Sequence, residues 1–310
     1  MKVLVTGGAG FLGARLCREL LKRNYNVIAL DNLYTGSREN IRDLQENPKF
    51  NFVTADVTSD LNYQIDGIFN LACPASPVHY QKNPIETIRT NILGSINVLE
   101  LASRSNVRVL QASTSEVYGD PLENPQSETY WGNVNPIGIR SCYDEGKRVA
   151  ETLFFDYHRQ NGVDIRVARI FNTYGPGMQL DDGRVVSNFI LQALTDKPLT
   201  VYGDGEQTRS FCYVSDLING LVKLFESEEK SSSPINLGNP TQVSMNDLAN
   251  MVIHMANSKS KIEYNPLPQD DPKLRCPNIS KAESLLNWSP QIDIQAGLTK
   301  TISDIKSRIS

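Results

Sequence analysis

Residues 1–13, MKVLVTGGAGFLG, place a short apolar run directly before a glycine turn and the start of an apolar-periodic helix. Gly7 suits a tight turn, Gly10 lets the backbone approach a pyrophosphate, and Gly13 lets the helix pack closely on the strand. The N-terminus of that helix offers free amide donors to phosphate groups. This order of strand, glycine turn and helix predicts a dinucleotide site within a parallel α/β fold. A plain structural turn is the alternative.

Acidic residues at the ends of the next two strands support the dinucleotide site. Asp31 ends the predicted second strand, where a carboxylate accepts from the ribose hydroxyls of NAD and repels the extra phosphate of NADP. Asn32 follows it and carries no positive charge, which favours NAD over NADP. Asp56 and Val57 are expected to cap the adenine, although an ordinary strand-end turn has the same pattern. Three apolar residues complete the predicted cofactor site: Phe11, Leu12 and Leu71.

The first 170 residues alternate apolar runs with longer periodic segments, as a doubly wound sheet requires. The apolar runs are rich in Val, Ile, Leu and Phe, which is typical of parallel strands covered on both faces. These predicted strands span Lys2–Thr6, Asn26–Leu30, Phe50–Thr54, Gly67–Leu71, Val107–Ala112 and Asp164–Ile170. The predicted helices span Phe11–Arg23, Pro84–Ser103 and Tyr143–Gln160. The alternation predicts a Rossmann-type parallel α/β sheet with right-handed crossovers.

The pattern becomes less regular after residue 170, where turn signals separate shorter elements. We therefore expect a dinucleotide-binding domain over residues 1–170 and a smaller lobe over residues 171–310. A segment at about 201–234 is expected to return to the first domain. Ligands of open α/β sheets bind outside the carboxyl ends of the strands. The lobe is thus predicted to cover that edge and to bind the substrate.

The composition argues against several classes of function. The 310 residues include 31 basic and 35 acidic side chains, so a net charge of -4 provides no cationic field for nucleic acid. Five cysteines and three histidines are scattered without the spacing of a metal site or a disulfide scaffold. No apolar run approaches the roughly 18 residues of a membrane helix, and no secretory leader precedes the first strand. We expect a cytoplasmic protein that holds no metal and binds neither membranes nor nucleic acid.

A tyrosine and a lysine four residues apart are the candidate reactive groups. Tyr143 and Lys147 share one face of a predicted helix, and a nearby ammonium favours the phenolate form of a tyrosine. We expect Lys147 to lower the pKa of Tyr143 toward that of a useful general base. The preceding strand ends in residues 113–116, STSE, where a hydroxyl can share a substrate oxygen with Tyr143. An incidental pair on a surface helix is the alternative.

Longer strings of the sequence resemble one family. The opening TGGAGFLG together with Ser115, Tyr143 and Lys147 is typical of the extended short-chain dehydrogenases/reductases. Residues 71–77 (LACPASP), 113–121 (STSEVYGDP), 131–138 (WGNVNPIG) and 182–189 (DGRVVSNF) look like the UDP-glucuronate decarboxylases, or UDP-xylose synthases. The resemblance runs from Met1 to about Thr301, and strings of this length are far more specific than a glycine motif.

The resemblance implies an NAD-dependent decarboxylation of UDP-glucuronate. Carbon 4 loses a hydride to NAD while Tyr143 removes the hydroxyl proton, which leaves a ketone beta to the carboxylate. Loss of carbon dioxide then produces an enolate stabilised by Ser115 and Tyr143. Glu116 is expected to manage the proton that returns to carbon 5, and a structural, solvent-facing acid is the alternative. Return of the hydride regenerates NAD in place and yields UDP-xylose.

Ser115 and Glu116 distinguish this reaction from those of related families. In dTDP-glucose 4,6-dehydratases an Asp stands at the position of Ser115 and acts with the following Glu to eliminate water. UDP-galactose 4-epimerases usually lack the acidic residue found here at Glu116. The remaining rivals are a UDP-sugar 4-epimerase, a decarboxylase that releases the 4-keto pentose, and a catalytically silent NAD-binding protein.

The resemblance also implies substrate contacts. Arginines suit a diphosphate because a guanidinium binds phosphate oxygens in pairs. Arg209 matches the family's phosphate-binding arginine, and Arg275 matches a second phosphate or ribose arginine. The other predicted contacts are Asn172 at the sugar and phosphate, Tyr202 beside the uracil, and Arg184 and Arg89 near the sugar.

Two further expectations follow from the family. Its members usually dimerise by pairing two helices of each subunit, which here are Pro84–Ser103 and Tyr143–Gln160, so a homodimer is expected. Most members carry an arginine where this chain has Gly177. We expect weaker substrate binding if that arginine orders the loop at the active site.

Overall fold

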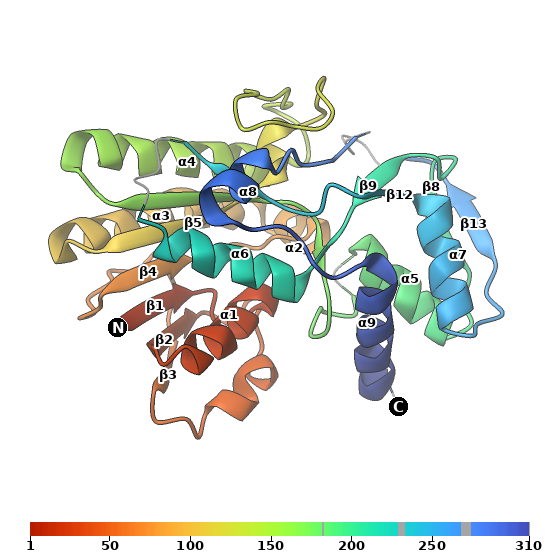
Figure 1. Cartoon of the computed structure of the whole chain (residues 1–310), viewed down its shortest axis with the longest axis horizontal. Coiled ribbons are helices and arrows are strands. Elements are labelled where there is room, and N and C mark those ends of the chain that lie inside the picture. The colour runs from red at the N-terminus through yellow and green to blue at the C-terminus, as the bar shows by residue number, and fades with distance from the viewer. Residues whose placement is uncertain (182, 229–232, 268–273, 310) are drawn as a thin grey trace.

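Seven parallel strands form the central sheet of the protein (Figure 1). The computed structural model describes all residues except 182, 229–232, 268–273 and 310. The strand order is β11-β6-β5-β4-β1-β2-β3. The strands are β1 (Lys2–Thr6), β2 (Asn26–Asp31), β3 (Phe50–Thr54), β4 (Gly67–Asn70), β5 (Arg108–Thr114), β6 (Ile165–Ile170) and β11 (Ile235–Leu237). The predicted Rossmann-type sheet is confirmed, and each predicted strand agrees with the structure to within two residues at either end.

Alternating side chains of the sheet enter two separate apolar cores. On β1, Val3 and Val5 belong to one buried cluster and Leu4 to the other, because successive side chains of a strand point to opposite faces. One face is covered by α3 (Pro84–Ser105) and α4 (Ser141–Asn161), which pack against each other and against β5. The other is covered by α1 (Phe11–Lys22) and α6 (Val214–Glu226). The all-apolar strands of the sequence are thus explained by burial on both faces.

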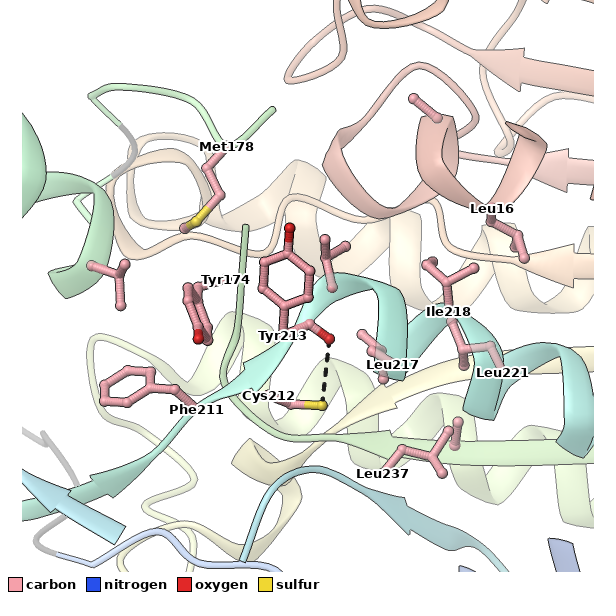
Figure 2. Close-up of a cluster of buried hydrophobic side chains, with 14 of the residues drawn as sticks. Leu16, Tyr174, Met178, Phe211, Cys212, Tyr213, Leu217, Ile218, Leu221 and Leu237 are labelled. Atoms are coloured by element: carbon pink, nitrogen blue, oxygen red, sulfur yellow. Dashed lines mark hydrogen bonds between the residues drawn. The ribbon is translucent and has the colours of Figure 1, made fainter. Parts of the chain in front are cut away.

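The second core continues from the sheet into the C-terminal lobe. Figure 2 shows Leu16 of α1 near Ile218 and Leu221 of α6, with Tyr213 and Phe211 leading toward the lobe. The same buried cluster includes lobe residues such as Leu248, Val252 and Leu298. Continuous packing of this kind holds the lobe against the carboxyl edge of the sheet.

The lobe contains short helices and small two-stranded sheets. Its sheets pair β10 (Cys212–Tyr213) with β7 (Thr173–Tyr174), β12 (Gln242–Ser244) with β9 (Thr208–Ser210), and β13 (Ile262–Asn265) with β8 (Leu199–Tyr202). Its helices are α5 (Val185–Leu194), α7 (Met245–Met255), α8 (Ser280–Leu286) and α9 (Ile294–Ile309). Within the described residues, no helix combines the length and apolar character needed to cross a bilayer.

The segment that returns to the sheet differs from the expected range of about 201–234. Residues 199–210 stay in the lobe, because β8 pairs with β13 and β9 pairs with β12. The returning elements are α6, which packs on α1, and β11, which pairs with β6. The segment between these elements includes residues 229–232, which lie outside the described residues.

Three short helices near the sheet edge had no counterpart among the predicted elements. They are the 3-10 helices η1 (Arg38–Leu44) and η2 (Ser115–Tyr118) and the α-helix α2 (Pro77–Lys82). Helices of four to seven residues carry too little periodicity to be read from an apolar pattern. All three border the cavity described next.

Candidate active site

A cavity of about 900 Å³ lies at the carboxyl edge of the sheet, between the sheet and the lobe. Its lining contains all but one of the residues that sequence analysis proposed. These are Gly7, Gly10, Phe11, Leu12, Gly13, Asp31, Asn32, Asp56, Val57, Leu71, Ser115, Glu116, Tyr143, Lys147, Asn172, Arg184, Tyr202, Arg209 and Arg275.

Arg89 is the exception. It lies on α3, its side chain is 57% exposed, and its guanidinium is 3.8 Å from the carboxylate of Glu86. It is absent from the cavity lining among the described residues. The structure thus places Arg89 outside the cavity, away from the other predicted sugar contacts. The sequence around Arg89 does not show whether its side chain faces the cavity or the solvent, because that depends on how α3 packs in the folded chain.

The glycine turn after β1 is packed too tightly for side chains. Gly7 has φ +69°, and a Cβ there would lie 3.0 Å from backbone atoms of Leu71 and Ala72. A Cβ on Gly13 would lie 2.0 Å from the carbonyl oxygen of Gly7. The turn thus brings α1 and the end of β4 together and leaves a backbone cradle at the N-terminus of α1. A dinucleotide phosphate fits such a cradle.

Asp31 closes the other side of this cradle. Its carboxylate accepts from the amide of Ala9 at 2.9 Å and from that of Leu33 at 2.8 Å. Burial raises the pKa of Asp31, and these backbone donors oppose that shift. Nearby, the side-chain amide of Asn32 donates to the carboxylate of Asp56 at 2.7 Å. The residues predicted to meet the ribose and adenine therefore form one continuous rim at the ends of β2 and β3.

Tyr143 and Lys147 are both buried at the start of α4. The ammonium of Lys147 donates to the carbonyl of Ala112 at 2.9 Å and lies 5.8 Å from the centre of the Tyr143 ring. Contrary to the expected lowering, burial raises the pKa of Tyr143 strongly, and Cys73 and Glu116 add to the effect. Thr114 opposes it through a hydrogen bond with Tyr143. Burial dominates the pKa of Tyr143 because it destabilises the phenolate more than the ammonium of Lys147, which is distant and itself desolvated, stabilises it.

Glu116 forms the centre of a buried charge cluster. One carboxylate oxygen accepts from Arg140 at 2.9 Å and the other from Arg275 at 2.7 Å. Only 8% of Glu116 is exposed, which excludes the solvent-facing alternative. Burial alone would raise its pKa, but the two guanidinium groups outweigh burial and hold the pKa below its usual range. Glu116 is therefore a carboxylate in this site.

Asp144 is a second buried carboxyl group near Glu116, and it is neutral where Glu116 is charged. Burial, then the charge of Glu116, raises the pKa of Asp144 to about 8. One of its carboxyl oxygens is buried without a hydrogen-bond partner among the described residues. Two neighbouring carboxyl groups thus differ in protonation because the arginines bind one of them directly.

Arg275 and Arg209 come together although they are far apart in the sequence. Their backbones form an isolated β-bridge, and the hydroxyl of Ser210 donates to the carbonyl of Arg275 at 3.2 Å. Arg275 also donates to the side-chain oxygen of Asn172 at 3.3 Å. Both arginines are 8% exposed. The site therefore concentrates positive charge at the end opposite the glycine turn.

The turn at Gly177 has an arginine beside it, although not within it. Gly177 has φ +85° and donates its amide to Asp304 at 3.0 Å. Arg15 of α1 donates to the carbonyl of Pro176 at 2.9 Å, and its guanidinium is 3.6 Å from where a Cβ of Gly177 would lie. The guanidinium beside this turn is thus supplied by α1.

Sequence reasoning missed two groups that line this site, Thr114 and Arg140, and one that packs behind it, Tyr80. Thr114 stood within the quoted STSE string, and its position before an acidic residue at a helix start was an available signal, since its hydroxyl accepts from the amide of Glu116 at 3.3 Å. Arg140 and Tyr80 offered none, because their roles depend on contacts with distant segments.

Comparison with known proteins identifies the family of this chain. A model of the NAD dependent epimerase/dehydratase family matches residues 3–238. UDP-glucuronic acid decarboxylase 1 of Arabidopsis thaliana is 55% identical over 309 residues, covering 100% of this chain and 71% of that protein. UDP-glucuronic acid decarboxylase 1 of Xenopus tropicalis is 52% identical over 301 residues, covering 97% and 71% of the two chains.

Solved structures of UDP-sugar epimerases have the same fold as this chain. UDP-glucose 4-epimerase of Thermotoga maritima, solved with UDP-glucose, has a TM-score of 0.92 at 26% identity and complete coverage of both chains. UDP-glucuronic acid 4-epimerase of Bacillus cereus, in complex with UDP-glucuronic acid and NAD, has a TM-score of 0.89 at 31% identity, covering 99% and 100%. The family and its NAD-bound structures support NAD as the cofactor. The chain belongs to the NAD dependent epimerase/dehydratase family, and within it shares more than half of its residues with UDP-glucuronic acid decarboxylases.

Proposed function

We propose that this protein converts UDP-glucuronate to UDP-xylose and carbon dioxide, with NAD regenerated in place. The observation that carries the proposal is the buried cluster of Glu116, Arg140 and Arg275 beside Tyr143 and Lys147. A cationic end suits a substrate with a diphosphate and a carboxylate, and a tyrosine beside it suits oxidation of a sugar hydroxyl. The names of the relatives at 52–55% identity support the same reaction.

The glycine turn and Asp31 would hold NAD, which supplies the hydride acceptor and then the hydride donor. The chain's own contribution is proton transfer and charge stabilisation. The phenolate of Tyr143 removes the proton from the sugar hydroxyl and becomes the phenol, and the hydroxyl of Thr114, already hydrogen-bonded to Tyr143, shares that substrate oxygen. Because burial raises the pKa of Tyr143, proton removal depends on the ammonium of Lys147 and on the cationic form of the bound cofactor.

Decarboxylation places negative charge on the sugar oxygen. Ser115 and the protonated Tyr143 would donate to that oxygen, because hydrogen-bond donors aimed at developing charge stabilise the transition state. Glu116 is held as a carboxylate by two arginines, so it would orient a water molecule for carbon 5 and keep Arg275 in place. As a carboxylate, Glu116 has no proton to deliver, so the proton that reaches carbon 5 comes from solvent through that water molecule.

The nucleotide end of the substrate would lie along the lobe. Arg209 and Arg275 would bind the diphosphate, with Asn172 positioned by Arg275. Tyr202 at the end of β8 is 46% exposed and faces the cavity, where a uracil ring could stack. Arg184 before α5 would reach the sugar.

Release of carbon dioxide from UDP-glucuronate, protein and NAD tests the proposal directly. We expect one carbon dioxide per UDP-xylose, no net NADH, and one deuterium at carbon 5 in heavy water. Net NADH would indicate a released 4-keto pentose. Interconversion with the 4-epimer and no gas would indicate an epimerase, and no turnover at all would indicate a silent NAD-binding protein; either result refutes the decarboxylase.

The proposal includes a homodimer formed through α3 and α4. The two helices pack side by side and expose Leu93 and Val149, each more than a third accessible. Light scattering should give about 69 kDa, twice the 34.6 kDa of one chain. A mass near one chain would contradict this.

A cytoplasmic location is also part of the proposal. It is supported by the five cysteines, all of which are free thiols, as a reducing compartment permits. Fractionation of the source cells would test it, and recovery of the protein outside the cytoplasmic fraction would contradict it.

A further inference from the structure

The short helix α2 buries one side chain. Of its six residues, Tyr80 is 1% exposed, and the others are partly or fully accessible. Its neighbours Val78, His79 and Gln81 line the cavity. A six-residue helix that buries a single ring adds little to the core. Its structural effect therefore depends on the contact made by that ring.

The ring of Tyr80 stacks on the ring of Tyr143. Their centroids are 5.0 Å apart and their planes differ by 5°. Tyr143 is otherwise restrained by the Thr114 hydrogen bond and by Lys147, whose ammonium lies 5.8 Å from the ring centre. Neither contact constrains the plane of the phenol as a parallel ring does, because a hydrogen bond at the hydroxyl permits rotation about the ring axis.

The backbone of Tyr80 is tied to the two helices that carry the site. Its carbonyl accepts from the hydroxyl of Thr87 on α3 at 3.4 Å and from the thiol of Cys142 on α4 at 3.6 Å. Its amide donates to Ser76 at 3.0 Å. Cys142 directly precedes Tyr143, so the two stacked rings are also linked through adjacent backbone.

The hydroxyl of Tyr80 does not provide the attachment. It is buried without a hydrogen-bond partner among the described residues, close to the charges of Arg140 and Glu116. Removal of such a hydroxyl costs little, since the group gains nothing where it lies. The ring, and not the hydroxyl, is the part of Tyr80 on which the neighbouring residues depend.

We propose that Tyr80 is a positioning residue, whose ring holds the phenol of Tyr143 in the orientation from which it reaches the substrate hydroxyl. This inference rests on the proposed function for its catalytic consequence. The stacking of Tyr80 on Tyr143 is itself testable independently of turnover.

Two variants of Tyr80 separate the ring from the hydroxyl. Tyr80→Phe keeps the stack, so kcat should stay near the wild-type value. Tyr80→Leu removes it, and we expect kcat to fall about 10- to 100-fold, since a displacement near 1 Å of a reacting group has effects of this size. The KM for UDP-glucuronate and the Kd for NAD should change little in both variants, because Tyr80 is not part of the cavity lining.

Phe154→Leu is the matched control. Phe154 is a fully buried ring on the same helix as Tyr143, in the apolar core away from the cavity. Its replacement should lower the melting temperature without lowering kcat per folded molecule. A general loss of packing in α4 would therefore affect both leucine variants, whereas a positioning role affects only Tyr80→Leu.

Crystal structures of the wild type, Tyr80→Phe and Tyr80→Leu with NAD bound complete the test. The Tyr143 ring should keep its orientation in Tyr80→Phe and rotate or become disordered in Tyr80→Leu. An unmoved ring, or an unchanged kcat in Tyr80→Leu, overturns the inference. If the wild type itself releases no carbon dioxide, the proposed function fails while the crystallographic comparison still decides the positioning of Tyr143.

Discussion

The two ends of the cavity are built in different ways. At the cofactor end, Gly7, Gly13 and Asp31 lie within one strand-turn-helix-strand unit and act through backbone shape and amide donors. At the substrate end, Glu116 meets Arg275, which lies 159 residues later in the chain. The first end depends on local conformation, and the second depends on buried charges brought together by the whole fold. Substitutions at the two ends should therefore have separable effects.

Tyr143→Phe lies where the two ends meet and should have the largest effect. Loss of the phenol hydroxyl removes the general base, which is worth roughly 100- to 10,000-fold in rate. We expect kcat to fall about 1,000-fold while the Kd for NAD, measured by fluorescence titration, is unchanged. Turnover within tenfold of the wild type would refute the assignment of Tyr143 as the base.

Glu116→Gln tests the substrate end. The variant leaves two buried guanidinium groups facing a neutral amide, and disruption of a buried charge pair costs about 2 kcal/mol or more, which is roughly 30-fold. We expect kcat/KM for UDP-glucuronate to fall by at least that factor, with NAD affinity unchanged.

Asp164→Asn is the matched control for Glu116→Gln. Asp164 also pairs with two arginines, Arg108 at 2.7 Å and Arg166 at 2.5 Å, and lies outside the cavity lining of the described residues. It should lower the melting temperature but not kcat/KM. Equal losses of kcat/KM in the two variants would show that the effect of Glu116 is structural.

Gly7→Ala, compared with Gly162→Ala, tests the cofactor end. The two glycines have nearly the same φ, +69° and +70°, but a Cβ on Gly162 meets nothing within 4 Å. Gly162→Ala should cost about 1 kcal/mol of stability through the left-handed conformation alone. Gly7→Ala should cost more and should also weaken NAD binding about tenfold, since its Cβ contacts the backbone of the cradle. Equal NAD affinity in both variants would contradict the tight approach.

Asp144→Asn should have the smallest effect on turnover. Its effect should appear in the pH dependence of stability. With a pKa of about 8 in the folded state, Asp144 keeps a proton that the unfolded chain has lost above about pH 4. The free energy of unfolding therefore falls as the pH rises toward 8. The asparagine variant should lose about 2 kcal/mol less than the wild type between pH 6 and pH 8, roughly 3 °C in melting temperature. If the melting temperatures of the two proteins change with pH by the same amount, the raised pKa of Asp144 is contradicted.

The sequence predicted the cofactor end better than the substrate end. Every predicted cofactor residue lines the cavity, because strand periodicity and glycine spacing are local properties. Among the substrate residues, Arg89 lies outside the cavity lining, and Arg140 was missed even though it binds Glu116. The direction of the Tyr143 pKa was also wrong, because the spacing to Lys147 is visible in a sequence whereas burial is not.

The alternating apolar runs by themselves determined the parallel sheet, and the glycine turn with Asp31 determined where a dinucleotide fits. These features require contacts only between neighbouring segments, which the local pattern encodes. Tertiary structure alone decided that Glu116 lies between Arg140 and Arg275 and stays ionised beside a protonated Asp144. It also decided that Tyr80 stacks on Tyr143. Burial and charge depend on which distant side chains exclude water from a group, and only the folded chain specifies those neighbours.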